Sequence, residues 1–437
     1  MKLPGRSIQV ILVFLIFQFG LFSSWQQLSF LSNSCEDAHD EEKQEHRIDR
    51  LKKYPSDPPA RHNQPDTTEE EHQFVDGVVA RAFPPWPEDL PLPCGEADPL
   101  WHTTAVSRSA TKEGILFVKE MKTGSSTLSG VVLRIARNIA ERRNQNFMCN
   151  SRFDHFPATA MEYIDRDPQK SFLFTILRNP QKRITSQFFH FSVSRLKLEP
   201  SDTVFQKFVE KSPHLHDYYL KDLGLGSGEA QAHKKIVSKH KPTMLESDRL
   251  QELRLKMANG IMQGYDFIGI TERMDESLVV LMMILRLKVS DILYIKAKSS
   301  GGFDDGAFNQ TCIYIVPSFT SPGMKKFFQS PDFFNRTEGD WMLYRAAEKS
   351  LDMTIDRLGR EQFERHLLEF QAAQKVANNK CSQGIRYPCS VNGVRAPYRR
   401  QSDPSTDCLW LDSGCGYECL DRLETEIDSM IEHTAYW

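Results

Sequence analysis

Residues 114–135 read GILFVKEMKTGSSTLSGVVLRI, and this stretch decides the fold. It opens with a short apolar run, which predicts a buried strand. A polar turn follows, and apolar residues then recur at the spacing of one helix face, at Leu128, Val131, Val132 and Ile135. We therefore expect residues 114–135 to form a strand, a tight turn and an amphipathic helix in succession.

The same order of elements occurs twice more. Residues 172–177 (FLFTIL) predict a second strand, and Pro180 stands at a suitable first position of a helix. Residues 267–270 (FIGI) predict a third strand, followed by a helix over 276–287. Three strand–helix units predict an α/β fold with a parallel sheet flanked by helices. Such sheets bind ligands where strands end and helices begin.

The composition is that of a globular protein. The chain has 437 residues, 40% of them hydrophobic, and its 55 Lys and Arg nearly balance its 58 Asp and Glu. With a formal net charge of −3, no global field draws the chain to nucleic acid, so any basic site is local. The 28 Phe and only 23 Gly exclude a wholly disordered chain and a collagen-like fibre.

The N-terminal region predicts membrane anchorage. Residues 8–25 are uncharged and mostly apolar, and a softer continuation extends the expected transmembrane signal anchor to 8–31. Lys2 and Arg6 precede it, whereas Glu36 and Asp37 are the first charges after it. The positive-inside rule then keeps residues 1–7 in the cytosol and sends the rest across the membrane, as a single-pass type II protein. A cleaved signal peptide is the alternative.

Three regions follow the expected anchor. Residues 32–93 are acidic and Pro-rich with few apolar side chains, and we expect a disordered stem. Residues 94–380 carry the strand–helix units and form the expected globular domain. Residues 381–437 contain five of the nine cysteines, and we expect this Cys-rich C-terminal extension to pack on that domain.

Cysteine usage indicates an oxidising compartment. Cys35 lies beside the expected anchor, and the other eight cysteines are an even set, compatible with disulfides whose pairing the sequence does not reveal. Zinc is the competing interpretation. There is no C-x-x-C, and only Cys415 and Cys419 in the C-terminal part are close enough for a ligand pair, so we prefer disulfides and expect no metal site. Glycosylation acceptors at Asn309 and Asn335 agree with lumenal exposure.

The first strand–helix junction carries a candidate anion site. Gly124 permits a tight turn, and the amides at the start of the helix point outward with the positive end of its dipole. A lysine and four hydroxyl side chains surround the same point: Lys122, Thr123, Ser125, Ser126 and Thr127. The alternative is a Ser/Thr-rich N-cap that satisfies only its own helix. A nucleotide triphosphatase loop requires G-x-x-x-x-G-K-[ST], whereas here the lysine precedes the glycine.

This K-T-G-S-S-T turn after a strand resembles the 5′-phosphosulfate loop of Golgi membrane-bound carbohydrate sulfotransferases, whose donor is 3′-phosphoadenosine 5′-phosphosulfate. The second junction, 178–189 (RNPQKRITSQFF), looks like the same family's 3′-phosphate motif, R-x-P-x-x-R-x-x-S-x-F/Y. The resemblance implies that Arg178 and Ser186 hold the 3′-phosphate. Arg183 is three residues from Ser186, so we expect the two to share a helix face. Asn179 departs from the usual Asp. A capped helix with solvated arginines is the alternative.

A third stretch, 265–285, is similar to one in the galactose 3-O-sulfotransferases and the heparan or uronyl 2-O-sulfotransferases. Its Asp275, Glu276 and Ser277 are expected to cap a helix. Together the resemblances cover roughly residues 114–357. They imply a P-loop-like sheet and sulfuryl transfer to a hydroxyl of a galactoside or uronic-acid glycan, on a glycoprotein, glycolipid or polysaccharide. They also imply a Golgi membrane protein with its catalytic domain in the lumen.

Such chemistry requires a cation at the leaving group and a base for the acceptor hydroxyl. Lys122 is the candidate for the charge that develops on the bridging oxygen, and no metal is required. His155 is the candidate base, because an imidazole accepts a proton near neutral pH and its segment loosely resembles the base-bearing segment of uronyl 2-O-sulfotransferases. Asp154 or Glu120 is the fallback. His190, among phenylalanines, is expected in the core.

The acceptor site is the least constrained part of the prediction. A basic run at 233–241 is a candidate for an acidic glycan but is more typical of solvated surface. Residues 296–300 follow a possible fourth strand and are a second candidate. Two other functions share the anchor and stem. One is a type II Golgi glycosyltransferase, whose metal-dependent members need D-x-D, present here as Asp165-Arg166-Asp167. The other is a non-enzymatic glycan-binding ectodomain.

Overall fold

The computed structural model describes residues 72–94, 112–145, 148–237, 243–296, 301–303, 312–385, 387, 389–395 and 414–434. The expected cytosolic tail (1–7), the expected anchor (8–31) and most of the expected stem lie outside these residues. Among the helices of the described part, none has the length and apolar character needed to span a bilayer.

The strands are β1 His72–Val75, β2 Val78–Arg81, β3 Gly114–Val118, β4 Ser151–Asp154, β5 Ser171–Leu177 and β6 Phe267–Ile270. The α-helices are α3 Ser125–Arg142, α4 Pro180–Gln187, α5 Asp202–Glu210, α6 Tyr218–Leu223, α7 Ser227–Val237, α8 Met244–Gly264, α9 Met274–Leu285, α10 Pro322–Phe328, α11 Pro331–Leu358, α12 Arg360–Cys381, α13 Tyr417–Arg422 and α14 Glu424–Thr434. A π-helix, η3 Phe188–Arg195, continues α4, and the short 3-10 helices are η2 Tyr163–Asp165, η4 Pro213–Leu215, η5 Thr271–Arg273, η6 Val289–Ile292 and η7 Ser382–Gly384.

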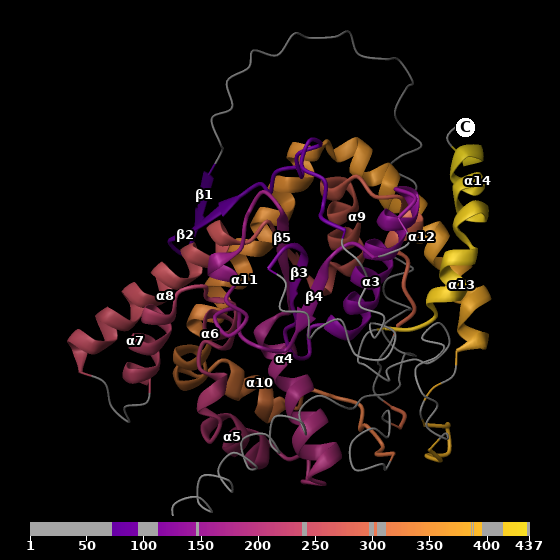
Figure 1. Ribbon diagram of the computed structural model, residues 1–437. Helices are drawn as coiled ribbons and strands as arrows, with labels where there is room; N and C mark the ends of the chain where they lie inside the picture. The colour runs from indigo at the N-terminus through magenta and orange to yellow at the C-terminus, as the bar shows by residue number, and fades with distance from the viewer. Residues whose placement is uncertain are drawn as a thin grey trace, which may run out of the picture.

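Four strands form a parallel sheet in the order β4-β3-β5-β6 (Figure 1). Val118, the last residue of β3, pairs with Asp154 of β4 and with Thr175 of β5, so the strands end at one edge of the sheet. The three predicted strands and the parallel α/β arrangement are confirmed. Sequence analysis missed β4, and the possible fourth strand before Lys296 is wrong, because that segment contains the short helix η6.

Helices cover both faces of the sheet. Figure 1 shows α3, α9 and α12 on one side of the strands and α6, α8 and α11 on the other. All seven residues of β5 are buried, which explains why its sequence is a continuous apolar run. Phe117 of β3 and Phe174 of β5 stack with ring centroids 4.8 Å apart. Because helices cover both faces of the sheet, its strand ends are where polar side chains can lie.

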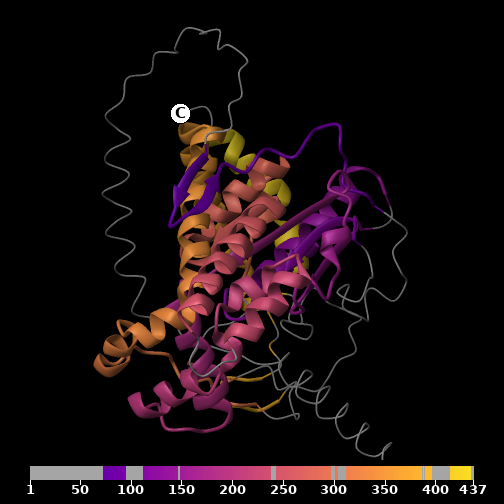
Figure 2. The same ribbon diagram turned by 90° about the vertical axis from the view of Figure 1, so that its left-hand side faces the viewer.

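The expected stem is too long, because its described residues, 72–93, belong to the folded domain. β1 and β2 form an antiparallel hairpin at one end of the long helices (Figure 2). Val78 and Phe83 have no exposed surface. The backbone N–H of Phe83 donates to the Thr354 hydroxyl of α11 at 2.9 Å, and that of Val79 to Asn259 of α8 at 2.8 Å. A few apolar residues in a Pro-rich segment are therefore enough to fix it on a preformed surface.

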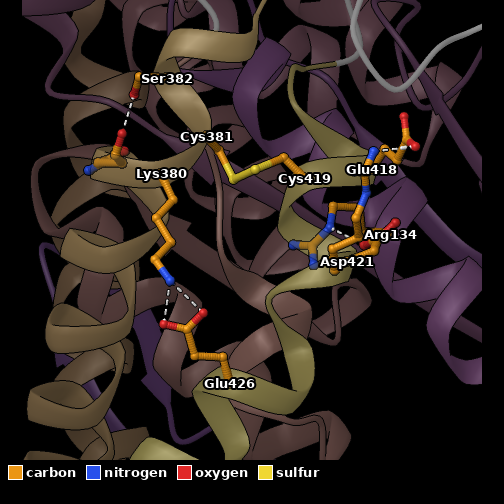
Figure 3. Close-up of a disulfide and its surroundings, with 10 residues drawn as sticks. Arg134, Lys380, Cys381, Ser382, Glu418, Cys419, Asp421 and Glu426 are labelled. Carbon is orange, nitrogen blue, oxygen red and sulfur yellow. Dashed lines mark hydrogen bonds and ion pairs between the residues drawn. A yellow bond between two sulfur atoms is a disulfide. The ribbon is translucent and has the colours of Figure 1, made fainter.

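Disulfides join the described cysteines as Cys94–Cys149, Cys312–Cys389 and Cys381–Cys419. Cys415 is also disulfide-bonded. The disulfide interpretation is therefore confirmed for these residues. Cys381–Cys419 ties α12 to α13, and beside it Asp421 forms an ion pair with Arg134 of α3 at 2.8 Å (Figure 3). Residues 414–434 of the C-terminal extension thus pack on the helix that follows the first junction.

Candidate functional site

The first junction is a tight loop between β3 and α3. Lys122 and Gly124 both have positive φ, 65° and 78°, and Gly124 is the N-cap of α3. Glycine suits this position because its φ of 78° lies in the left-handed region, which residues with a side chain rarely adopt. Gly124 has no side chain with which to cap α3, and no acid lies in the first turn of the helix. The N-cap position itself is therefore not a Ser or Thr.

The hydroxyl groups of the loop divide into two pairs. Thr123 and Ser125 are buried and donate to the Glu120 carbonyl at 3.0 and 2.6 Å. They hold the turn closed, so their protons are not available to an anion and only their backbone amides are. Ser126 and Thr127 lie in the first turn of α3, largely and partly buried. The expectation that all four hydroxyls surround one point is thus corrected for Thr123 and Ser125.

Arg178 lies at the end of β5, one strand away from this loop. Its Nη1 donates to the Lys122 carbonyl at 3.2 Å, which joins two motifs that are 56 residues apart in the sequence. Its Nε lies 3.9 Å from Glu272 Oε1, and 30% of the Arg178 side chain is exposed. The structure therefore brings the two predicted anion motifs into direct contact. The partly exposed Arg178 guanidinium lies between the Lys122 carbonyl and the Glu272 carboxylate.

The second junction satisfies its own helix. Asn179 is the N-cap of α4, and its Oδ1 accepts from the Gln181 and Lys182 amides at 3.1 and 3.3 Å. Asn179 thus supplies the cap that the family's usual Asp would supply, without the charge. Ser186, two turns into α4, is partly exposed. An anion at this junction would therefore be bound by the side chains of Arg178 and Ser186 rather than by the helix end.

Arg183 lies three residues before Ser186 on α4, but its side chain is buried whereas Ser186 is partly exposed. Its guanidinium is fully buried, with Cζ 4.0 Å from the ring centroid of Tyr218 and 5.1 Å from that of Tyr219. Its Nη1 donates to Gln187 at 3.0 Å. A long side chain can turn from its helix face toward aromatic rings, where a cation–π interaction holds it. The alternative of a solvated arginine is wrong at this position.

The segment after β4 brings His155 to the same edge of the sheet. The Lys119 amide donates to the Asp154 carbonyl at 2.9 Å, so β4 ends directly beside the first loop. The Asp154 carboxylate accepts from the His155 amide at 2.8 Å, and burial raises its pKa. His155 itself is partly exposed. His155, Lys122 and Arg178 therefore lie at the carboxyl ends of three adjacent strands, β4, β3 and β5.

Two other predicted residues lie in the interior. Glu120 is 1% exposed, and burial raises the pKa of its carboxyl well above the usual range, against a hydrogen bond from Tyr218 and the charge of Arg183. Because its carboxyl is buried in the interior, Glu120 does not fit the role of fallback base. His190 is buried in the π-helix η3, as expected for a core residue.

The described residues do not place the acceptor candidates or the D-x-D motif at the two junctions. His233 is fully buried and 2.7 Å from Asp217, so it is not part of a basic surface. Residues 238–242, residues 297–300 and Asn309 lie outside the described residues. Asp165 and Asp167 precede β5 and so lie at the opposite edge of the sheet from the junctions. No group of three or more His, Cys, Asp or Glu side chains in the described part is arranged to hold a metal ion.

Sequence analysis missed α6, whose two tyrosines lie beneath both junctions. Tyr218 contacts the first loop and Tyr219 contacts Arg178. No spacing marks these residues as part of a site. Their one signal is that buried tyrosine hydroxyls need hydrogen-bond partners.

No protein-family model matches the chain, and no curated protein matches it. The site therefore stands on its geometry and on the resemblance of its two motifs.

Proposed function

We propose that this protein is a sulfotransferase that moves a sulfuryl group from 3′-phosphoadenosine 5′-phosphosulfate to a hydroxyl of a glycan, a galactoside or a uronic-acid-containing polysaccharide. The observation that carries the proposal is the hydrogen bond from Arg178 Nη1 to the Lys122 carbonyl. It joins the two predicted anion motifs side by side at one edge of the sheet. The donor carries its two anionic groups on one ribose, at the 3′ and 5′ positions, so it needs two adjacent anion sites.

In this proposal each of the two junctions binds one anionic end of the donor. The 5′-phosphosulfate is bound by the amides at the start of α3 and by the Lys122 ammonium. The N-cap of α3 is a glycine without a side chain, which fits this role. Arg178 and Ser186 bind the 3′-phosphate. As the acceptor oxygen bonds to sulfur, the bond from sulfur to the bridging oxygen breaks, and Lys122 stabilises the charge left on that oxygen. His155 takes the proton of the acceptor hydroxyl.

The proposed compartment is the Golgi lumen, with residues 8–31 as the membrane anchor. Disulfides among described cysteines support an oxidising compartment, since cytosolic thiols are kept reduced.

A transfer assay tests the proposal. The purified full-length chain is incubated with radiolabelled donor and a panel of galactosides and uronic-acid glycans, without added manganese. We expect label on one acceptor class, loss of transfer in Lys122→Ala and Arg178→Ala, and no loss in Lys325→Ala, an exposed lysine on α10. Consumption of a sugar nucleotide would instead support a glycosyltransferase, and glycan binding without turnover a binding ectodomain.

A further inference from the structure

A six-residue helix, α6, packs beneath the candidate site, and four of its six residues are buried. Tyr219, Leu220 and Leu223 have no exposed area. The start of α6 is fixed to the long helix α11, because the Asp340 carboxylate accepts from the Tyr219 amide at 2.7 Å and the Asp217 carboxylate from the Gly339 amide at 2.8 Å. α6 is therefore attached to the body of the protein independently of the loops above it.

From this position the Tyr218 and Tyr219 hydroxyls of α6 reach both strand–helix junctions. The Tyr218 hydroxyl accepts from the Met121 amide of the first loop at 3.4 Å. The Tyr219 hydroxyl accepts from the Arg178 amide at 3.0 Å and donates to the Arg178 carbonyl at 2.7 Å. Tyr219 thus satisfies both backbone groups of Arg178 at the point where β5 ends.

The other end of α6 reaches the segment that follows β4. The Asp222 carbonyl accepts from the Ala158 amide at 2.7 Å, three residues beyond His155. Arg183 lies across the rings of both tyrosines and so holds their orientation from the α4 side. One short element is therefore hydrogen-bonded to all three segments that carry Lys122, Arg178 and His155.

We propose that α6 sets the relative positions of the two donor-binding junctions and the base-bearing segment, and we call it the bracket for that reason. Within it, Tyr219 is the positioning residue for Arg178. This inference rests on the proposed function. Tyr219 acts through Arg178, which fixes the direction from which the guanidinium meets a 3′-phosphate. Arg183, the second arginine of the R-x-P-x-x-R motif, supports the bracket and is not a phosphate ligand.

The test compares Tyr219→Phe with Thr354→Val. Thr354 is a matched control because its hydroxyl is also fully buried, accepts from the Phe83 amide at 2.9 Å and donates to the Ser350 carbonyl at 2.6 Å, and neither partner belongs to α6 or to a donor-binding segment. We expect Tyr219→Phe to raise the donor KM and weaken the affinity for adenosine 3′,5′-bisphosphate by about tenfold or more, with kcat little changed. A purely structural role would lower the melting temperature of both variants and leave their KM alike.

A second readout separates this inference from the proposed function. The Arg178 amide loses its acceptor in Tyr219→Phe, so hydrogen exchange at that amide should be faster than in wild type and in Thr354→Val. If wild type fails to bind the bisphosphate, the proposed function fails, and faster exchange alone still supports the bracket. Unchanged exchange overturns the bracket. So does equal donor affinity of the two variants when wild type binds.

Discussion

Both strand–helix junctions follow a buried apolar strand, but they differ in how the helix begins. At β3–α3 the N-cap is Gly124, which has no side chain to cap the helix. At β5–α4 the N-cap is Asn179, which accepts from two amides of its own helix. The first junction therefore offers backbone amides and a helix dipole, whereas the second offers only side chains. Under the proposed function, this difference suits the first junction to the phosphosulfate end of the donor and the second junction to its 3′-phosphate.

The largest expected effect is on kcat, in Lys122→Ala. Removing the cation where charge develops should lower kcat by about 100- to 1000-fold, the usual result of losing one such group. Affinity for the spent donor should fall less, because the amides of α3 remain. Steady-state kinetics at saturating donor measure this. A rise in KM at unchanged kcat would mean that Lys122 binds the donor without acting in the transition state.

The next effect is on donor affinity, in Arg178→Ala. Hydrogen bonds to charged groups contribute about 1.5–3 kcal/mol each, so donor KM should rise by about ten- to a hundredfold with a smaller change in kcat. Arg178→Lys should not restore it, because a lysine lacks the planar pair of donors. Should the two substitutions Lys122→Ala and Arg178→Ala change kcat and KM in the same proportions, the division of labour between the junctions would be wrong.

A smaller effect concerns stability, in Asn179→Ala. Loss of the α4 cap should cost about 1 kcal/mol, or a few degrees in melting temperature, and Asn179→Asp should keep the cap. Thermal unfolding followed by circular dichroism measures both. Equal melting temperatures for wild type and Asn179→Ala would show that α4 does not depend on its cap, and the contrast with α3 would lose its basis.

The last prediction is a pH dependence at Asp340, which anchors the helix beneath both junctions. Burial raises its pKa to about 7, against the charge of Arg183. The unfolded value is about 3.9, so the folded protein holds this proton more tightly, and the stability it contributes is lost as the pH rises from about 4 through 7. Asp340→Asn keeps a neutral acceptor at every pH. The melting temperature of wild type minus that of the variant should therefore fall by a few degrees over this range. A constant difference would contradict the raised pKa.

The sequence predicted what local pattern determines. β3, β5 and β6 are continuous apolar runs because helices cover both faces of the sheet, so they were found with their ends nearly correct. β4 has only four residues, SRFD, of which three are polar, and no period distinguishes it from a loop. The hairpin at 72–81 was missed because its burial depends on α8 and α11, which are distant in sequence.

The site shows the same limit. Lys122, Arg178 and His155 were identified because each follows a strand or a motif, and the carboxyl ends of parallel strands meet at one edge. The fate of Arg183 was not predictable from its spacing, since it depends on two tyrosines of α6. The inward turn of Thr123 and Ser125 depends on the loop closing onto the Glu120 carbonyl. In each case a tertiary contact decides among orientations that the local sequence leaves open.

The central claim is that both junctions bind one doubly phosphorylated adenosine, and titration calorimetry tests it most directly. Wild type should bind adenosine 3′,5′-bisphosphate at one site, more tightly than adenosine 5′-phosphate. Arg178→Ala should bind the two nucleotides equally. Absence of binding to the bisphosphate, or an unchanged preference for it in Arg178→Ala, would contradict the account.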